Sequence, residues 1–185
     1  GLGKVAQPIR VAVSGRAHRF LVERFRGRAD IAFEEIYGLH LAYEGSRLDL
    51  GASVMENLRD GPRGLRRNLE VYGRLADDFN ADAVVSDFES WAYLYGLARR
   101  IPVISIDNMQ VLNRCAHDQF VTDGGSSDYR LAKTAVKIKL PGAFHYLVSS
   151  FFYPPVRKPR TTLVPPILRP EILGARREPG RHILV

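Results

Sequence analysis

The sequence contains one cysteine, one tryptophan and two methionines in 185 residues. Because a disulfide requires two cysteines, Cys115 excludes an internal disulfide and favours a reducing compartment. The five histidines are His18, His40, His117, His145 and His182. None of them forms a pair at helical spacing or a cluster with the cysteine, so we expect no metal site.

Several motifs that would identify a function are also absent. The glycine-lysine pattern of a P-loop does not occur, which removes the support for that class of nucleotide site. The G-x-S-x-G turn of serine hydrolases does not occur either. No run approaches the roughly 20 apolar residues that a membrane-spanning helix needs.

The net charge is +7, and much of the excess lies late in the chain. The late basic residues are Arg157, Lys158, Arg160, Arg169, Arg176, Arg177 and Arg181. Such an excess suits a nucleic acid, an anionic membrane surface or a phosphorylated substrate. Because these residues are not interleaved with a repeating aromatic platform, we favour a solvated basic surface and expect no nucleic-acid partner.

Short apolar runs alternate with amphipathic segments along most of the chain. The runs at Ile9–Ser14, Ile31–Ile36, Ala83–Ser86 and Ile101–Ile106 predict strands. The segments Ala17–Phe25 and Phe88–Arg99 predict helices. Continuous apolar strands alternating with helices indicate an α/β fold, with a parallel sheet covered by helices on both faces.

The pattern between these elements is less regular. Leu41–Gly51 is predicted to be a loop, because Gly45 and Ser46 interrupt it. An apolar stripe predicts an amphipathic helix over Arg63–Asn80, with Pro62 just before its start.

Further helices are predicted over Asn108–Ala116 and Tyr129–Lys139, and a strand over Phe144–Tyr153. The prolines that follow, up to Pro166, predict a linker. Arg181–Val185 has the composition of a further strand.

Polar residues follow three of the predicted strands. They are Ser14, Gly15 and Arg16, then Asp87 and Glu89, and then Asp107 and Asn108. In open parallel sheets, ligands bind outside the carboxyl ends of the strands, so we predict a binding site there. The alternative is that Ser14, Asp87 and Asn108 only cap the helices that follow them.

Taken together, several segments resemble a known family. They are GLGK at the start, VAVSGRAHRFL at Val11–Leu21, ADAVVSDFES at Ala81–Ser90, IPVISIDNMQ at Ile101–Gln110 and FFYPPVRKPRTTLVPPILRPEI at Phe151–Ile172. In this combination, the chain resembles the predicted glycosyltransferases of the GT-B fold found in bacteria and archaea.

The resemblance implies two Rossmann-like domains, of which the N-terminal one binds the acceptor and the C-terminal one the nucleotide sugar. On this basis residues 1–160 are expected to form the acceptor-binding domain. Residues 161–185 are expected to form an interdomain linker and the first strand of a truncated donor-binding domain. The implied activity is sugar transfer to an acceptor hydroxyl without a cofactor, and the piece is expected to be inactive alone.

The resemblance also suggests roles for the polar residues. Asp87 is the expected base or acceptor-orienting group, with Glu89 as a second catalytic candidate. The expected substrate-binding residues are Gly3, Lys4, Ser14, Gly15, Arg16, Asp107 and Asn108. Lys4 stands where the family has a histidine, so either residues are missing after Gly3 or this loop differs. A lysine is a poor base unless desolvated, but it can bind a phosphate.

The expected partners are a nucleotide sugar and an acceptor that is a glycan, a lipid-linked molecule or a small molecule. The expected location is the cytoplasm, and the basic, aromatic late segment is compatible with peripheral contact at the inner membrane face. One alternative is a non-catalytic Rossmann-like module that binds a sugar or nucleotide. Another is a nucleic-acid-binding or regulatory protein, whose binding would be salt-sensitive.

Overall fold

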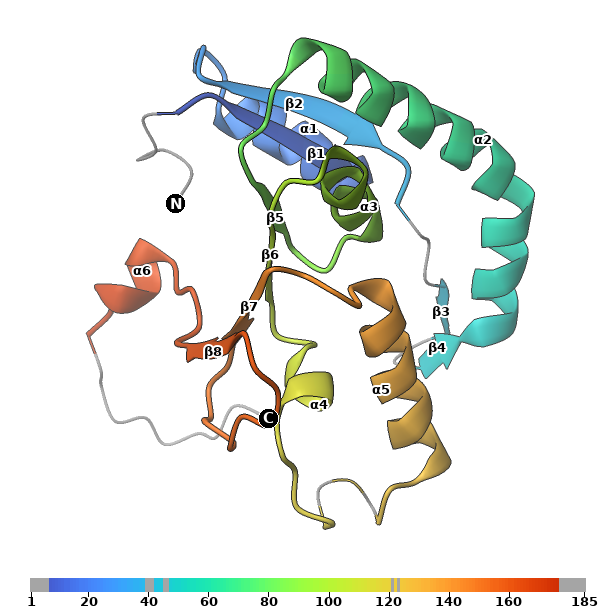
Figure 1. The fold of residues 1–185 in the computed structure, drawn as a ribbon, viewed down its shortest axis with the longest axis vertical. Helices are drawn as coiled ribbons and strands as arrows, with labels where there is room; N and C mark the ends of the chain where they lie inside the picture. The colour runs from blue at the N-terminus through green and yellow to red at the C-terminus, as the bar shows by residue number, and fades with distance from the viewer. Residues whose placement is uncertain (1–6, 39–41, 45–46, 121, 123, 177–185) are drawn as a thin grey trace. The chain divides into compact units, whose positions relative to one another are not determined.

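A computed structural model describes residues 7–38, 42–44, 47–120, 122 and 124–176. The chain divides into two compact units (Figure 1). The first unit comprises Gly1–Ala83 and Leu94–Ile101, and the second comprises Val84–Tyr93 and Pro102–Val185. In the described part of the chain, no helix has the length and apolar character to cross a bilayer.

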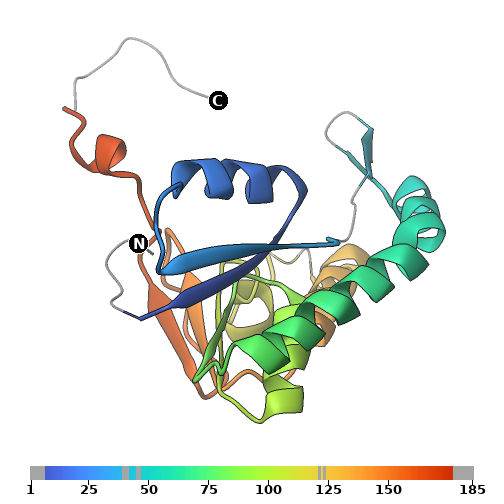
Figure 2. The same ribbon diagram turned by 90° about the horizontal axis from the view of Figure 1, so that it is seen from above.

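The first unit is built on two parallel strands joined by a helix. Strand β1 (Ile9–Ser14) pairs with β2 (Ile31–Ile36), and α1 (Gly15–Arg24) connects them. Strand residues alternate between the two faces of a sheet. Phe33 accordingly packs against Phe25, just beyond the end of α1, and Ile36 lies in a core with helix α2 (Leu50–Asp78). Figure 2 shows α1 on one side of the two strands and α2 on the other. The strands and helix predicted here are confirmed.

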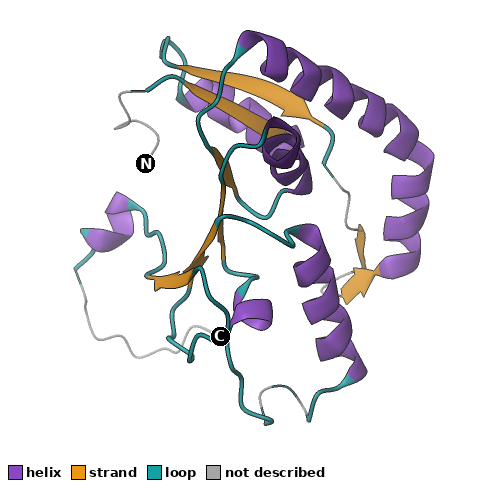
Figure 3. Cartoon of the chain, viewed as in Figure 1, coloured by secondary structure: helices purple, strands orange, loops and turns teal. Residues whose placement is uncertain are grey.

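The segment after β2 differs from the prediction. Strands β3 (Ala42–Glu44) and β4 (Arg47–Asp49) form an antiparallel pair where a loop was expected. Figure 3 shows helix α2 directly following them. This helix begins 13 residues before Arg63 and contains Pro62 in its interior. An interior proline removes one backbone hydrogen bond and its ring crowds the carbonyl four residues earlier, so a helix that continues through it is stabilised elsewhere.

The core of the first unit holds α2 against β2. Ile36, Val71 and Leu75 are buried, and Tyr72 and Tyr95 pack around them. The partly buried hydrophobic residues of the core are Ala12, Tyr72, Phe79 and Tyr95. Burying such side chains is the main source of folding free energy.

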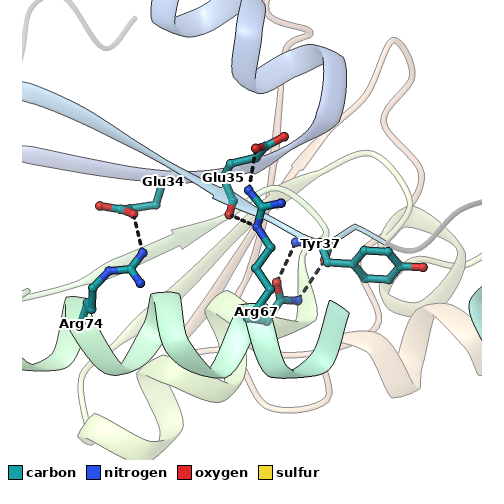
Figure 4. Close-up of polar contacts among 6 residues, drawn as sticks. Glu34, Glu35, Tyr37, Arg67 and Arg74 are labelled. Atoms are coloured by element: carbon teal, nitrogen blue, oxygen red, sulfur yellow. Dashed lines mark hydrogen bonds and ion pairs between the residues drawn. The ribbon is translucent and has the colours of Figure 1, made fainter. Parts of the chain in front are cut away.

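Polar contacts fix the register of α2 on β2 (Figure 4). Arg67 forms an ion pair of 2.6 Å with Glu35, and Arg74 one of 3.3 Å with Glu34. Asn68 is fully buried, and its side-chain amide donates to the carbonyl of Tyr37 at 2.9 Å and accepts from its N–H at 2.7 Å.

The second unit contains a four-stranded parallel sheet in the order β5-β6-β7-β8 (Figure 1). Its strands are β5 (Val84–Ser86), β6 (Val103–Asp107), β7 (His145–Ser149) and β8 (Thr161–Val164). Its helices are α3 (Ser90–Arg99), whose last six residues belong to the first unit, α4 (Val111–Arg114), α5 (Ser127–Lys139) and α6 (Pro170–Leu173). The α/β fold class predicted from the sequence is confirmed, with the parallel strands divided between two sheets.

The linker predicted among the prolines includes one strand. Thr161–Val164 form the edge of the sheet as β8, so these four residues are not a linker. Prolines are tolerated at the ends of an edge strand, which is why Pro159 and Pro165 can flank it. The strand expected at Arg181–Val185 lies outside the described residues.

The core of the second unit lies where α5 leads into β7. Leu140, Ala143, Tyr146 and Val148 are buried there. The hydroxyl of Tyr146 donates to the carbonyl of Leu140 at 2.8 Å and accepts from the N–H of Ala143 at 3.0 Å. These bonds satisfy a buried hydroxyl and fix the turn between helix and strand.

Candidate functional site

The carboxyl ends of β5 and β6 lie next to each other in the second unit. β5 ends at Ser86, which pairs in register with Ser105, and β6 ends at Asp107. This pairing brings together Asp87 and Glu89, which follow β5, with Asp107. We define Asp87, Glu89 and Asp107 as the carboxylate cluster.

A tight turn after β5 sets the directions of the first two carboxylates. The hydroxyl of Ser86 accepts from the N–H of Glu89 at 3.0 Å and donates to its carbonyl at 2.8 Å. Phe88 has a φ of +54°, in the left-handed region that non-glycine residues rarely adopt. Backbone strain of this kind persists only where the surroundings impose it, and it concentrates at functional sites.

Glu89 caps helix α3. Its Oε2 atom accepts a hydrogen bond of 2.7 Å from the N–H of Ala92, in the first turn of the helix. Such a bond satisfies one of the free N–H groups at a helix start. The helix cap that the sequence allowed for Asp87 is therefore provided by Glu89.

Asp107 is buried, and both of its carboxylate oxygens accept hydrogen bonds. Oδ2 accepts from the hydroxyl of Ser105 at 2.6 Å, and Oδ1 accepts from the N–H of Gln110 at 2.8 Å. Asn108 is exposed, and its backbone carbonyl accepts from the N–H of Val111 at 3.2 Å. Asp107 thus holds the turn into α4.

Asp87 differs from the other two carboxylates. Among the residues that the structure describes, none donates a hydrogen bond to its side chain. Loss of hydration raises the pKa of Asp87, and the negative charge of Asp107 raises it further. Asp87 is exposed, so a substrate can reach it, and a carboxylate with a raised pKa is a stronger base than one with the ordinary pKa.

Lys139 is a fourth charged member of this region, and the sequence analysis missed it. It is the last residue of α5, and its Nζ lies 4.3 Å from the centre of the Phe88 ring. Burial lowers the pKa of Lys139, and the charges of Glu89 and Asp107 oppose that effect. A basic residue in the last turn of a helix is ordinary, so no sequence signal identified it.

The remaining predicted site residues belong to the first unit or lie outside the described residues. Ser14 and Gly15 form the turn from β1 into α1 in the first unit, and Gly15 has a φ of +56°. The hydroxyl of Ser14 makes no cap hydrogen bond to α1, and a Cβ atom at Gly38 would come within 2.5 Å of it. Arg16 is exposed in the same unit. Gly3 and Lys4 lie outside the described residues.

A profile of the family described as Glycosyl transferase family 1 matches residues 2–185. The chain belongs to this family. No match was found among curated proteins, nor among solved structures. Family membership assigns the chain to glycosyl transfer, with a sugar donor and an acceptor as its general partners.

The carboxylate cluster is the candidate functional site of this glycosyl transferase family 1 chain. Its parallel α/β sheets are consistent with a Rossmann-like half of a GT-B fold. Among the described residues, no group of three His, Cys, Asp or Glu side chains is arranged to hold a metal ion.

Proposed function

We propose that the chain is the acceptor-side part of an enzyme that transfers a sugar from a nucleotide sugar to an acceptor hydroxyl. The observation that carries this proposal is the contrast within the carboxylate cluster. Glu89 and Asp107 accept hydrogen bonds from the protein, whereas no described residue donates one to Asp87. Asp87 is thus the carboxylate that can accept a hydrogen bond from a substrate hydroxyl.

In the proposed reaction, the oxygen of the acceptor hydroxyl attacks the anomeric carbon of the donor sugar, and Asp87 takes the proton of that hydroxyl. The bond from that carbon to the nucleoside diphosphate breaks, and the diphosphate leaves with the electron pair. The raised pKa of Asp87 favours proton uptake. Lys139 balances the negative charge of Glu89 and Asp107 beside it. We also propose that a second domain binds the nucleotide sugar, as the GT-B resemblance implies. The proposed location is the cytoplasm, because the single cysteine favours a reducing compartment.

The first test compares Asp87→Asn and Asp87→Ala with the wild type. Transfer is measured as nucleoside diphosphate release from a panel of nucleotide sugars in the presence of acceptor. Loss of a general base is expected to slow transfer by about 10²–10⁴-fold. Asp82→Asn, at an exposed position shortly before β5, is the matched control and should keep the wild-type rate. A wild-type rate in both Asp87 variants would exclude the proposed role.

A second test identifies the donor by thermal stability. A ligand that binds only the native state adds about 2.7 kcal/mol at a hundredfold excess over its dissociation constant. A nucleotide sugar that stabilises the protein and is also turned over supports the transferase. Stabilisation by a sugar or nucleotide without turnover would favour a non-catalytic binding module instead.

A further inference from the structure

Four cations of the second unit come together from two parts of the chain. Lys133 and Lys137 lie one helical turn apart on α5, and Arg157 and Lys158 lie between β7 and β8. We call these four residues the basic cluster. The sequence analysis identified Arg157 and Lys158 as part of the late positive charge, but it did not connect Lys133 and Lys137 with them.

Backbone pairing places Arg157 and Lys158 beside helix α4. The N–H of Ala116 donates to the carbonyl of Pro155 at 2.8 Å, and the N–H of Arg157 donates to that of Arg114 at 2.8 Å. This short antiparallel pairing runs the segment along the end of α4, which itself packs against α5. The basic cluster is therefore held by the fold and does not lie on a free loop.

A chain of hydrogen bonds, part-buried at Lys158 and buried beyond it, connects the basic cluster to the carboxylate cluster. Lys158 Nζ donates to Asn113 Oδ1 at 2.5 Å, and Asn113 Nδ2 donates to Gln110 Oε1 at 3.1 Å. The N–H of Gln110 in turn donates to Asp107 at 2.8 Å. Gln110 is completely buried and Asn113 is 5% exposed. Buried polar networks that are satisfied in this way are rigid, so Lys158 is fixed relative to Asp107.

No carboxylate neutralises these cations in the described part of the chain. All the ion pairs found there lie between Arg28 and Arg74, in the first unit. Burial lowers the pKa of Lys158, and the positive charges of Arg114, Lys137, Lys133 and Arg157 lower it further. Like charges held together in this way repel one another, and a bound anion would remove the repulsion.

We propose that the basic cluster binds a phosphate group of the acceptor. Lysine ammonium groups and an arginine guanidinium are the side chains that bind phosphate, and arginine does so with two parallel hydrogen bonds. The buried connection to Asp107 places such a group in the same unit as the carboxylate cluster. The identification of the ligand as the acceptor rests on the proposed function, whereas binding of phosphate does not.

The same chemistry can come from a soluble phosphorylated acceptor or from a lipid headgroup. Phe151, Phe152 and Tyr153 are 82%, 56% and 62% exposed and precede Arg157 on the same segment. Exposed aromatic side chains beside basic ones suit a membrane surface, so both sources are tested.

The experiment measures binding of pyrophosphate to the full chain by isothermal titration calorimetry. The double variant Lys137→Ala/Arg157→Ala removes two exposed side chains, so it should not disturb folding. Because each lost charged hydrogen bond is worth about 1.5 kcal/mol or more, we expect at least tenfold weaker binding. Lys158→Met is the second variant, with the same expectation. The matched control is Arg19→Ala/Arg24→Ala, which removes two exposed charges from α1 and should leave the affinity unchanged.

Vesicles of phosphatidylglycerol, with phosphatidylcholine as the comparison, provide the second arm. Pyrophosphate binding that depends on the basic cluster supports a soluble phosphorylated acceptor. Binding only to phosphatidylglycerol, with the same dependence, supports a lipid headgroup. The proposal is overturned if neither probe binds, or if the control weakens binding as much as the cluster variants do. Because pyrophosphate affinity should not depend on Asp87, failure of this site and failure of the transferase appear in separate experiments.

Discussion

The ammonium group of Lys139 lies 4.3 Å from the centre of the Phe88 ring. Phe88 is the residue after β5 that has a positive φ. Lys139→Met removes the charge and keeps most of the side chain. We expect transfer to fall about tenfold or more, because Glu89 and Asp107 lose their neighbouring cation. The measurement is kcat/KM, with urea unfolding as a check on stability. Arg130→Met, exposed on the same helix, should change neither, and equal losses in both variants would contradict the prediction.

Asp107 should control the pH dependence of the reaction. The negative charge of Asp107 raises the pKa of Asp87, so Asp107→Asn should lower that pKa. The acidic limb of the kcat/KM profile should then move to lower pH, although partial loss of hydration at Asp87 keeps part of the shift. Asparagine can still accept the hydrogen bond from the N–H of Gln110. An acidic limb that stays in place or moves upward would contradict the assignment of Asp87 as the base.

Asp87 should also reduce stability at neutral pH. A carboxyl whose pKa is raised on folding binds protons more tightly in the native state than in the unfolded state. Stability is therefore lost as the pH rises from the unfolded pKa through the folded one. Asp87→Asn should raise the free energy of unfolding at pH 7, and the difference should vanish below the unfolded pKa of about 4. Urea titrations across this range test the sign, and destabilisation by Asp87→Asn at pH 7 would reverse it.

Asn68 should make a large polar contribution to the stability of the first unit. Asn68→Ala leaves the N–H and the carbonyl of Tyr37 without their side-chain partner in a partly buried position. The expected loss is about 2–4 kcal/mol of unfolding free energy. Arg67→Ala, at the adjacent position of α2, breaks the exposed ion pair with Glu35 and should cost less than about 1 kcal/mol. Similar losses in the two variants would show that burial of Asn68 does not matter.

The strands of this fold were largely predictable because their sequences are locally self-consistent. Ile9–Ser14 and Ile31–Ile36 have the predicted bounds, and Val103–Asp107 differs from its prediction by two residues at the start and one at the end. The start of α2 was not predictable in this way. Gly61 and Pro62 are the residues that usually precede a helix, and here they lie inside one. Packing of Val71 and Leu75 on Ile36 stabilises the part of the helix after Pro62, which the sequence did predict.

The candidate site was predictable only in part, for a related reason. Asp87, Glu89 and Asp107 follow apolar strands, so the rule for parallel sheets identified them. Whether each carboxylate is free to bind a substrate depends on hydrogen-bond donors that the sequence does not reveal. For Glu89, the donor is the N–H of Ala92. Lys139 reaches the site through a long-range contact with Phe88, which no local pattern encodes.

Helix α3 belongs to both units, because Ser90–Tyr93 fall in the second and Leu94–Arg99 in the first. The ring of Tyr95 packs on Tyr72, and its hydroxyl lies within 3.4 Å of the carbonyls of Leu75 and Phe79. A protein cut after Ala83 would lose this residue from the first core and leave it unsupported in the other piece. Neither unit is a single consecutive stretch of sequence, so neither can be exchanged between proteins by one cut in the chain. A chimeric protein would have to take both units from the same parent.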